Sequence, residues 1–164
     1  MKAGAAEPGG TNIGRVGVGV AVRNNGNPPD ISSTDALKRS LTQADSVVMN
    51  RASTGIYVEG MLKKIGLWTA IEAKTTRYPD GASVMEHLQK GRGYEFGFGA
   101  TTEILLYKDK GLRLVGPLPA DVQNYTSYIA ALTATGKQSI AARELVTYLA
   151  TPDARKALSA NGVE

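Results

Sequence analysis

The sequence contains no cysteine and a single histidine, His87. The absence of cysteine excludes disulfide bonds, thiolate metal ligands and cysteine nucleophiles. One histidine without cysteine does not make a zinc site of the usual kind, and no serine–histidine–aspartate arrangement has supporting context. Aspartates and glutamates are spread along the chain without a pair placed for acid–base catalysis. We therefore expect neither an enzyme nor a bound cofactor.

Charge of one sign is not concentrated anywhere in the chain. The 164 residues include 19 lysines and arginines against 15 aspartates and glutamates, a net charge of +4. The basic residues form no run and are not interleaved with aromatic residues, so nucleic acid is not an expected partner. A mildly basic chain suits an anionic ligand without selecting one. No apolar run approaches transmembrane length, and the first ten residues lack the apolar core of a signal peptide.

Strand-like and helix-like segments alternate along most of the sequence, which predicts an α/β fold with a mainly parallel sheet. The length allows one domain or two small lobes. Period-two and buried apolar patterns predict strands over residues 15–23, 47–49, 73–77, 94–99, 112–115 and 125–132. Helical spacing and capping residues predict helices over 35–43, 54–65, 82–90, 139–149 and 152–160.

The stretch from Asn50 to Leu62 is the most informative about function. It follows the apolar run 46–49 and opens a helix, with Ser53 or Thr54 as the expected N-cap and Gly55 allowing close backbone approach. Unpaired N–H groups at such a helix start carry partial positive charge and suit an anion. An ordinary capped helix that binds nothing is the alternative.

Two further Gly-containing junctions follow. Residues 80–83 form a second helix start, where Gly81 and Ala82 could present N–H groups toward the first; taken alone, this is also an ordinary turn and cap. Gly97 and Gly99, which flank Phe98, match neither the dinucleotide fingerprint nor the Walker pattern.

Taken in order, several segments resemble the molybdate-binding type of periplasmic solute-binding proteins that serve ABC transporters. The similarity covers almost everything after about Thr11, and it rests on the order and spacing of the segments rather than on a single motif. The segments are VGVGVAVR (16–23), PPD (28–30), DALK (35–38), STGIY (53–57), LKKIG (62–66), VGPLP (115–119) and QNYT (123–126).

The resemblance implies a type 2 periplasmic-binding-protein fold, in which two α/β lobes are joined by crossing strands and hold an oxyanion between them. It divides the chain into a flexible lead-in (1–13), a crossing strand (14–23), a second α/β lobe (24–120), and a return strand with C-terminal helices of an incomplete first lobe (121–164). A first lobe truncated in this way would expose apolar surface and favour a homo-oligomer.

The resemblance also assigns residues and partners. Thr54 and the Gly81–Ala82 pair match backbone donors to the anion, and Ser53 could add its hydroxyl. Phe98 lies near a family tyrosine that contacts the ligand, but it lacks the hydroxyl. The implied ligand-binding residues are Ser53, Thr54, Gly55, Gly81, Ala82 and Phe98.

The implied function is non-catalytic capture of a small, molybdate-like oxyanion in the periplasm for delivery to an ABC transporter permease. Two alternatives stay open. The same fold serves as the effector-sensing domain of transcription regulators, although residues 1–12 contain no helix-turn-helix. A second-lobe module that binds no ligand and oligomerises is the other.

Overall fold

The computed structural model describes residues 6–164. The chain divides into two compact units, one formed by Gly17–Tyr125 and one by residues up to Val16 together with Thr126–Glu164.

The unit Gly17–Tyr125 is built on a mixed sheet with the strand order β3-β2-β4-β1-β5. β2 runs parallel to both β3 and β4, whereas β1 is antiparallel to β4 and β5. Parallel neighbours joined through helices confirm the predicted α/β class. The strands are β1 (Thr11–Arg23), β2 (Ser46–Asn50), β3 (Thr75–Tyr78), β4 (Glu95–Ala100) and β5 (Leu112–Pro117).

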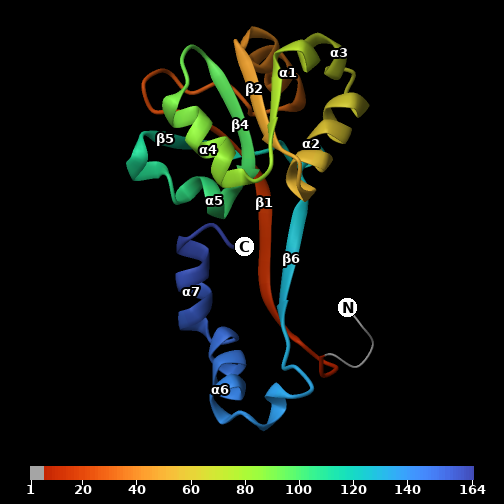
Figure 1. The fold of residues 1–164 in the computed structure, drawn as a ribbon, viewed down its shortest axis with the longest axis vertical. Helices are drawn as coiled ribbons and strands as arrows, with labels where there is room; N and C mark the ends of the chain where they lie inside the picture. Colours follow the sequence, from red (N-terminus) through yellow and green to blue (C-terminus); the bar gives the residue numbers. More distant parts are fainter. Residues whose placement is uncertain (1–5) are drawn as a thin grey trace. The chain divides into compact units, whose positions relative to one another are not determined.

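Helices cover both faces of this sheet, and Figure 1 shows α2 and α4 on opposite sides of β2 and β4. Side chains alternate along β2: Val47 and Met49 join the core beneath α2, while Val48 joins the core beneath α4. The helices are α1 (Thr34–Gln43), α2 (Ser53–Lys64), α3 (Trp68–Ile71), α4 (Gly81–Lys90) and α5 (Thr101–Leu105), with 3₁₀ turns at Glu72–Lys74, Lys108–Lys110 and Ala120–Val122.

The two cores are apolar and closely packed. Val58 and Leu62 of α2, and Val84 and Leu88 of α4, have no exposed surface. Burying each such side chain contributes about 1.5–3 kcal/mol, so packing against the sheet, rather than helix propensity, holds these helices in place.

Glycines on β1 allow another segment to come close, as the sequence predicts. A β-carbon placed on Gly19 would lie 2.8 Å from Leu114 Cδ1 and 3.0 Å from Thr101 Cγ2. β1 can therefore lie against β5 and α5 only with a very small residue at this position.

The other unit combines the first part of β1 with β6 (Tyr125–Ala130), which pairs with β1, and with α6 (Ile140–Leu149) and α7 (Pro152–Ala160). Ser139 and Thr151 accept hydrogen bonds at the starts of α6 and α7. Pro152 occupies the first turn of α7, as predicted. Apolar side chains that are at least half exposed are Tyr128, Ile129, Ile140, Leu145 and Tyr148. Self-association through this surface stays a prediction.

The observed elements differ from the predicted ones in a few places. α3 and α5 were not predicted, because helices of four and five residues are too short to show helical periodicity. Of the predicted lead-in, residues 1–5 lie outside the described residues. Glu7 donates its N–H to the carbonyl of Leu132, and β1 begins at Thr11, earlier than predicted.

Candidate functional site

The starts of α2 and α4 lie at the same edge of the sheet. Asn50 at the end of β2 pairs with Tyr78 at the end of β3, and the Arg51 N–H donates to the Tyr78 carbonyl at 2.8 Å. α2 begins at Ser53 and α4 at Gly81, three residues beyond these paired positions. We call this the carboxyl edge, meaning the edge where β2, β3 and β4 end. The two helices leave it on opposite faces of the sheet.

Asn50 caps α2, so the prediction of Ser53 or Thr54 as N-cap is wrong. The N-cap residue is Ala52, which makes no side-chain cap bond. Asn50 Oδ1 accepts the N–H groups of Ala52 at 3.1 Å and Gly55 at 2.9 Å, from a side chain only 6% exposed. The N–H groups of Ser53 and Thr54 have no acceptor within the helix.

Gly55 is required by packing within the protein rather than by a ligand. A β-carbon at this position would lie 1.7 Å from the backbone oxygen of Asn50. Its N–H is also taken by Asn50 Oδ1. Both contacts hold the start of α2 against the end of β2, and a contact between Gly55 and a ligand stays a prediction.

Asp80 caps the start of α4. Its carboxylate accepts the Ser83 N–H at 2.8 Å, and hydrogen bonds from the Ser83 backbone and hydroxyl lower the pKa of Asp80. The N–H groups of Gly81 and Ala82 have no acceptor within the helix. This second helix start was predicted correctly.

Glu103 lies against the same helix start, and sequence reasoning missed it. A β-carbon on Gly81 would lie 1.8 Å from Glu103 Oε2, so the carboxylate contacts the Gly81 backbone. Burial raises the pKa of Glu103, and the charge of Asp80 raises it further. Its position in the sequence could have indicated it, because Glu103 lies three residues after the end of β4, and β4 ends at the carboxyl edge.

Phe98 is fully buried in the core beneath α2. Phe96 and Phe98 point to the same face of β4, because strand residues two apart share a face. The Phe98 ring is therefore part of the core, and its contact with a ligand stays a prediction.

A polar network lies near the start of β4. Glu95, whose side chain is 8% exposed, pairs with Arg23, accepts the Ser46 hydroxyl at 2.7 Å and contacts His87 Nε2 at 3.1 Å. His87 Nδ1 lies 2.8 Å from the Tyr78 hydroxyl. Burial tends to raise the pKa of Glu95, but hydrogen bonds from Arg23, Ser46 and His87 outweigh it, so this pKa is lowered. This network links four strands and α4.

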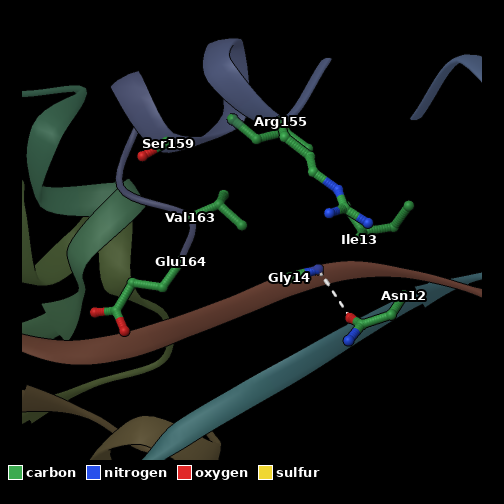
Figure 2. Close-up of a pocket in the computed structure, with 8 residues that line it drawn as sticks. Asn12, Ile13, Gly14, Arg155, Ser159, Val163 and Glu164 are labelled. Atoms are coloured by element: carbon green, nitrogen blue, oxygen red, sulfur yellow. Dashed lines mark hydrogen bonds between the residues drawn. The ribbon is translucent and has the colours of Figure 1, made fainter. Parts of the chain in front are cut away.

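A cavity of about 330 Å³ lies within the other unit, between the first residues of β1, the helix α7 and the last residues of the chain. Figure 2 shows Arg155 reaching from α7 toward Ile13, and the Gly14 N–H donating to Asn12 Oδ1 at 3.0 Å. The predicted site residues are not among those that line it. Its lining consists of Asn12, Ile13, Gly14, Arg155, Leu158, Ser159, Val163 and Glu164.

Residues 6–164 contain neither a membrane-spanning helix nor a cluster of side chains suited to a metal ion. No helix there combines the length and the apolar character needed to cross a membrane. No group of three or more histidine, aspartate or glutamate side chains in that range is arranged to hold a metal ion.

Among solved structures, the chain resembles the substrate-binding domain described as part of a molybdenum ABC transporter from Clostridium difficile. The TM-score is 0.72 at 14% identity, over 94% of this chain and 65% of that one. It also resembles the periplasmic molybdate-binding protein of Azotobacter vinelandii, with a TM-score of 0.68 at 16% identity, over 98% of this chain and 70% of that one. These similarities show the periplasmic-binding-protein fold.

In sequence, an aconitate isomerase from a Pseudomonas species is 30% identical over 154 residues, which is 93% of this chain. The chain spans 57% of the length of that relative. A family model described as bacterial extracellular solute-binding protein matches residues 1–164. Because that model covers the whole chain, the protein belongs to the family of bacterial extracellular solute-binding proteins.

Proposed function

We propose that the protein binds a small, molybdate-like oxyanion without catalysis, at the carboxyl edge between the starts of α2 and α4. The observation that carries this proposal is the pairing of Asn50 with Tyr78, which brings the two helix starts to the ends of neighbouring parallel strands. In open α/β sheets, ligands characteristically bind outside the carboxyl ends of the strands.

The donors are neutral backbone N–H groups. Ser53 and Thr54 offer two from α2, and Gly81 and Ala82 offer two from α4. Fixed N–H groups at helix starts stabilise an anion without a buried counter-charge. Asn50 supports this arrangement, because it holds the first turn of α2 while leaving the Ser53 and Thr54 donors uncommitted. The Ser53 hydroxyl adds a further donor.

Family membership and the molybdate-binding structural neighbours support the wider role. In that role the bound anion is delivered in the periplasm to the permease of an ABC transporter. Effector sensing in a transcription regulator and a non-binding module that self-associates are the alternatives. A non-binding module would give no heat with any anion and would sediment as an oligomer.

The experiment is isothermal titration of the protein with molybdate, tungstate, sulfate and phosphate, using matched variants at Ser53. Ser53→Pro removes one N–H from the first helical position, where proline fits. Ala52 has φ −88° and ψ −170°, an extended conformation that proline tolerates in the preceding residue. Ser53→Ala keeps the N–H and removes the hydroxyl.

We expect Ser53→Pro to weaken binding about ten- to hundredfold, because a hydrogen bond to a charged group contributes about 1.5–3 kcal/mol. Ser53→Ala should lose less. Equal affinities for the wild type and Ser53→Pro would place the anion elsewhere. No heat with any of the four anions would contradict the proposal.

The aconitate isomerase relative supports one further ligand, a tricarboxylate. Aconitate therefore belongs in the same titration. Proton NMR of cis-aconitate incubated with the protein tests the alternative of an enzyme. Appearance of the trans isomer would contradict non-catalytic binding.

A further inference from the structure

Glu103 stands beside the donors of α4. Its Oε2 and Oε1 atoms would lie 1.8 and 2.4 Å from a β-carbon on Gly81, and Oε2 would lie 3.6 Å from one on Gly99. The carboxylate therefore occupies space between the end of β4 and the first residue of α4. It can do so only because residue 81 is a glycine, whereas a β-carbon on residue 99 would make an ordinary van der Waals contact with it.

A second carboxylate flanks the same N–H groups. Asp80 is held by its hydrogen bond to the Ser83 N–H, and its lowered pKa keeps it ionised. Burial raises the pKa of Glu103, and the negative charge of Asp80 raises it further. Of these two carboxyl groups, Glu103 is therefore the one that protonates more easily.

The other ionisable groups on elements that contact α5 have partners or lie in solvent. On β4, Glu95 is paired with Arg23, and on β5 the Arg113 guanidinium donates to Asn24 Oδ1 at 2.7 Å. On α4, the ionisable residues are Glu86, His87 and Lys90, of which His87 is bound to Glu95 and the other two are exposed. Asp80 is thus the charge that acts on Glu103.

This arrangement bears on the choice of anion. A fully deprotonated dianion at the Gly81 and Ala82 N–H groups would face two negative carboxylates. One added proton removes the conflict. A protonated Glu103 donates its O–H to an anion oxygen, or an anion that carries a hydroxyl donates that proton to the Glu103 carboxylate.

We propose that the site takes its anion together with one proton, shared between Glu103 and the ligand. Glu103 then determines specificity: it favours oxyanions or carboxylic acids that carry a proton, and it makes the binding of a proton-free dianion depend on pH. This inference rests on the proposed function and specifies the ligand of that same site.

The test is calorimetric titration of the wild-type protein with molybdate and with hydrogen phosphate. Titrations in two buffers of different ionisation enthalpy, between about pH 5 and 8, measure the protons taken up on binding. We expect the protein to take up about one proton for each molybdate bound. It should take up fewer for each hydrogen phosphate, because that anion already carries a proton. The affinity for molybdate should fall about tenfold per pH unit above the pKa of Glu103.

Glu103→Gln should abolish the pH dependence for molybdate and raise its affinity at the alkaline end, because the amide stays neutral and can donate. Glu86→Gln, which removes an exposed charge from α4, is the matched control and should keep the wild-type pH dependence. Circular dichroism establishes that both variants fold. The number of protons that the wild type takes up with molybdate tests the proposal even if neither variant folds.

The outcomes separate the two proposals. Binding of molybdate without proton uptake by the wild type, or unchanged pH dependence in Glu103→Gln, overturns this inference and leaves the proposed function standing. Absence of binding to both anions across the whole pH range overturns the proposed function and this inference with it.

Discussion

The two ends of β4 place glutamates in opposite environments. Glu95 at its start is almost fully buried and has Arg23, Ser46 and His87 as partners, which together lower its pKa. Glu103, just past its end, is partly buried beside Asp80, and its pKa is raised. The negative charge of Glu95 is thus balanced by a cation, whereas the negative charge of Glu103 is disfavoured by a neighbouring carboxylate.

The different surroundings of the two glutamates distinguish a carboxylate that stabilises the fold from one that is available for binding. A buried carboxylate with several donors is fixed in one state, so it can hold strands and a helix together but cannot respond to a ligand. A carboxylate that faces another carboxylate exchanges a proton readily and changes state when an anion arrives. The carboxyl edge is therefore where ligand chemistry is expected.

Among the substitutions considered, Arg23→Met should cause the largest loss in the free energy of unfolding. Glu95 would lose its ionic partner in a buried position, and the carbonyls of Leu88 and Gly93 would each lose a donor. Breaking one side of a buried ion pair costs about 3–5 kcal/mol. Urea unfolding followed by fluorescence of Trp68, the single tryptophan, measures this in the unit that contains it.

Lys90→Met is the control for that experiment. Lys90 and Glu86 form an ion pair of 3.9 Å with side chains 80% and 59% exposed. Exposed pairs contribute about 0–1 kcal/mol. Equal losses in Arg23→Met and Lys90→Met would mean that Glu95 is not held by Arg23 in the way described.

Two glycines at the carboxyl edge provide the next comparison. In Gly55→Ala the new methyl group would lie 1.7 Å from the backbone oxygen of Asn50, so the helix or the strand must move, at a cost of about 3 kcal/mol. In Gly81→Ala the obstacle is the flexible end of Glu103, which can rotate away, so the change should stay within about 1 kcal/mol. The same urea experiment measures both. A larger loss for Gly81→Ala than for Gly55→Ala would mean that Glu103 is rigidly held.

The elements of the fold were largely predictable from the sequence. The strand over 46–50 and the helix over 81–90 follow from apolar periodicity and from Asp80 as a cap, both of which are local signals. The register that brings Asn50 beside Tyr78 is a long-range property, and no local pattern specifies it.

The site was predicted less completely, for a related reason. Both helix starts were found, but Asn50 was missed as the cap because it lies three residues before the helix instead of directly at its start. Alternation along β4 turns the Phe98 ring into the core, which the resemblance to a ligand-contacting position does not indicate. Glu103 was missed because its importance depends on Gly81, a residue 22 positions earlier in the chain.

The smallest expected effect concerns the pH dependence of the free energy of unfolding, to which Glu103 and Glu95 should contribute with opposite signs. A raised pKa in the folded state means that the folded protein binds the proton more tightly than the unfolded chain. The contribution of Glu103 is therefore fully present below the pKa of the unfolded chain, about 4.3, and is lost as pH rises through the folded pKa. Glu95 has the opposite sign, since its lowered pKa stabilises the fold above that value and loses this effect in acid.

Glu103→Gln should therefore be more stable than the wild type near neutral pH, by less than about 1 kcal/mol because solvent screens a partly exposed group. The two proteins should converge at about pH 4 or below, where the wild-type carboxyl is protonated in both states. Urea unfolding at several pH values, with Glu86→Gln as the control, gives the difference. A variant less stable than the wild type at neutral pH would show that the Glu103 carboxylate stabilises the start of α4 as a negative charge, and the contrast between the two ends of β4 would then be one of degree rather than of sign.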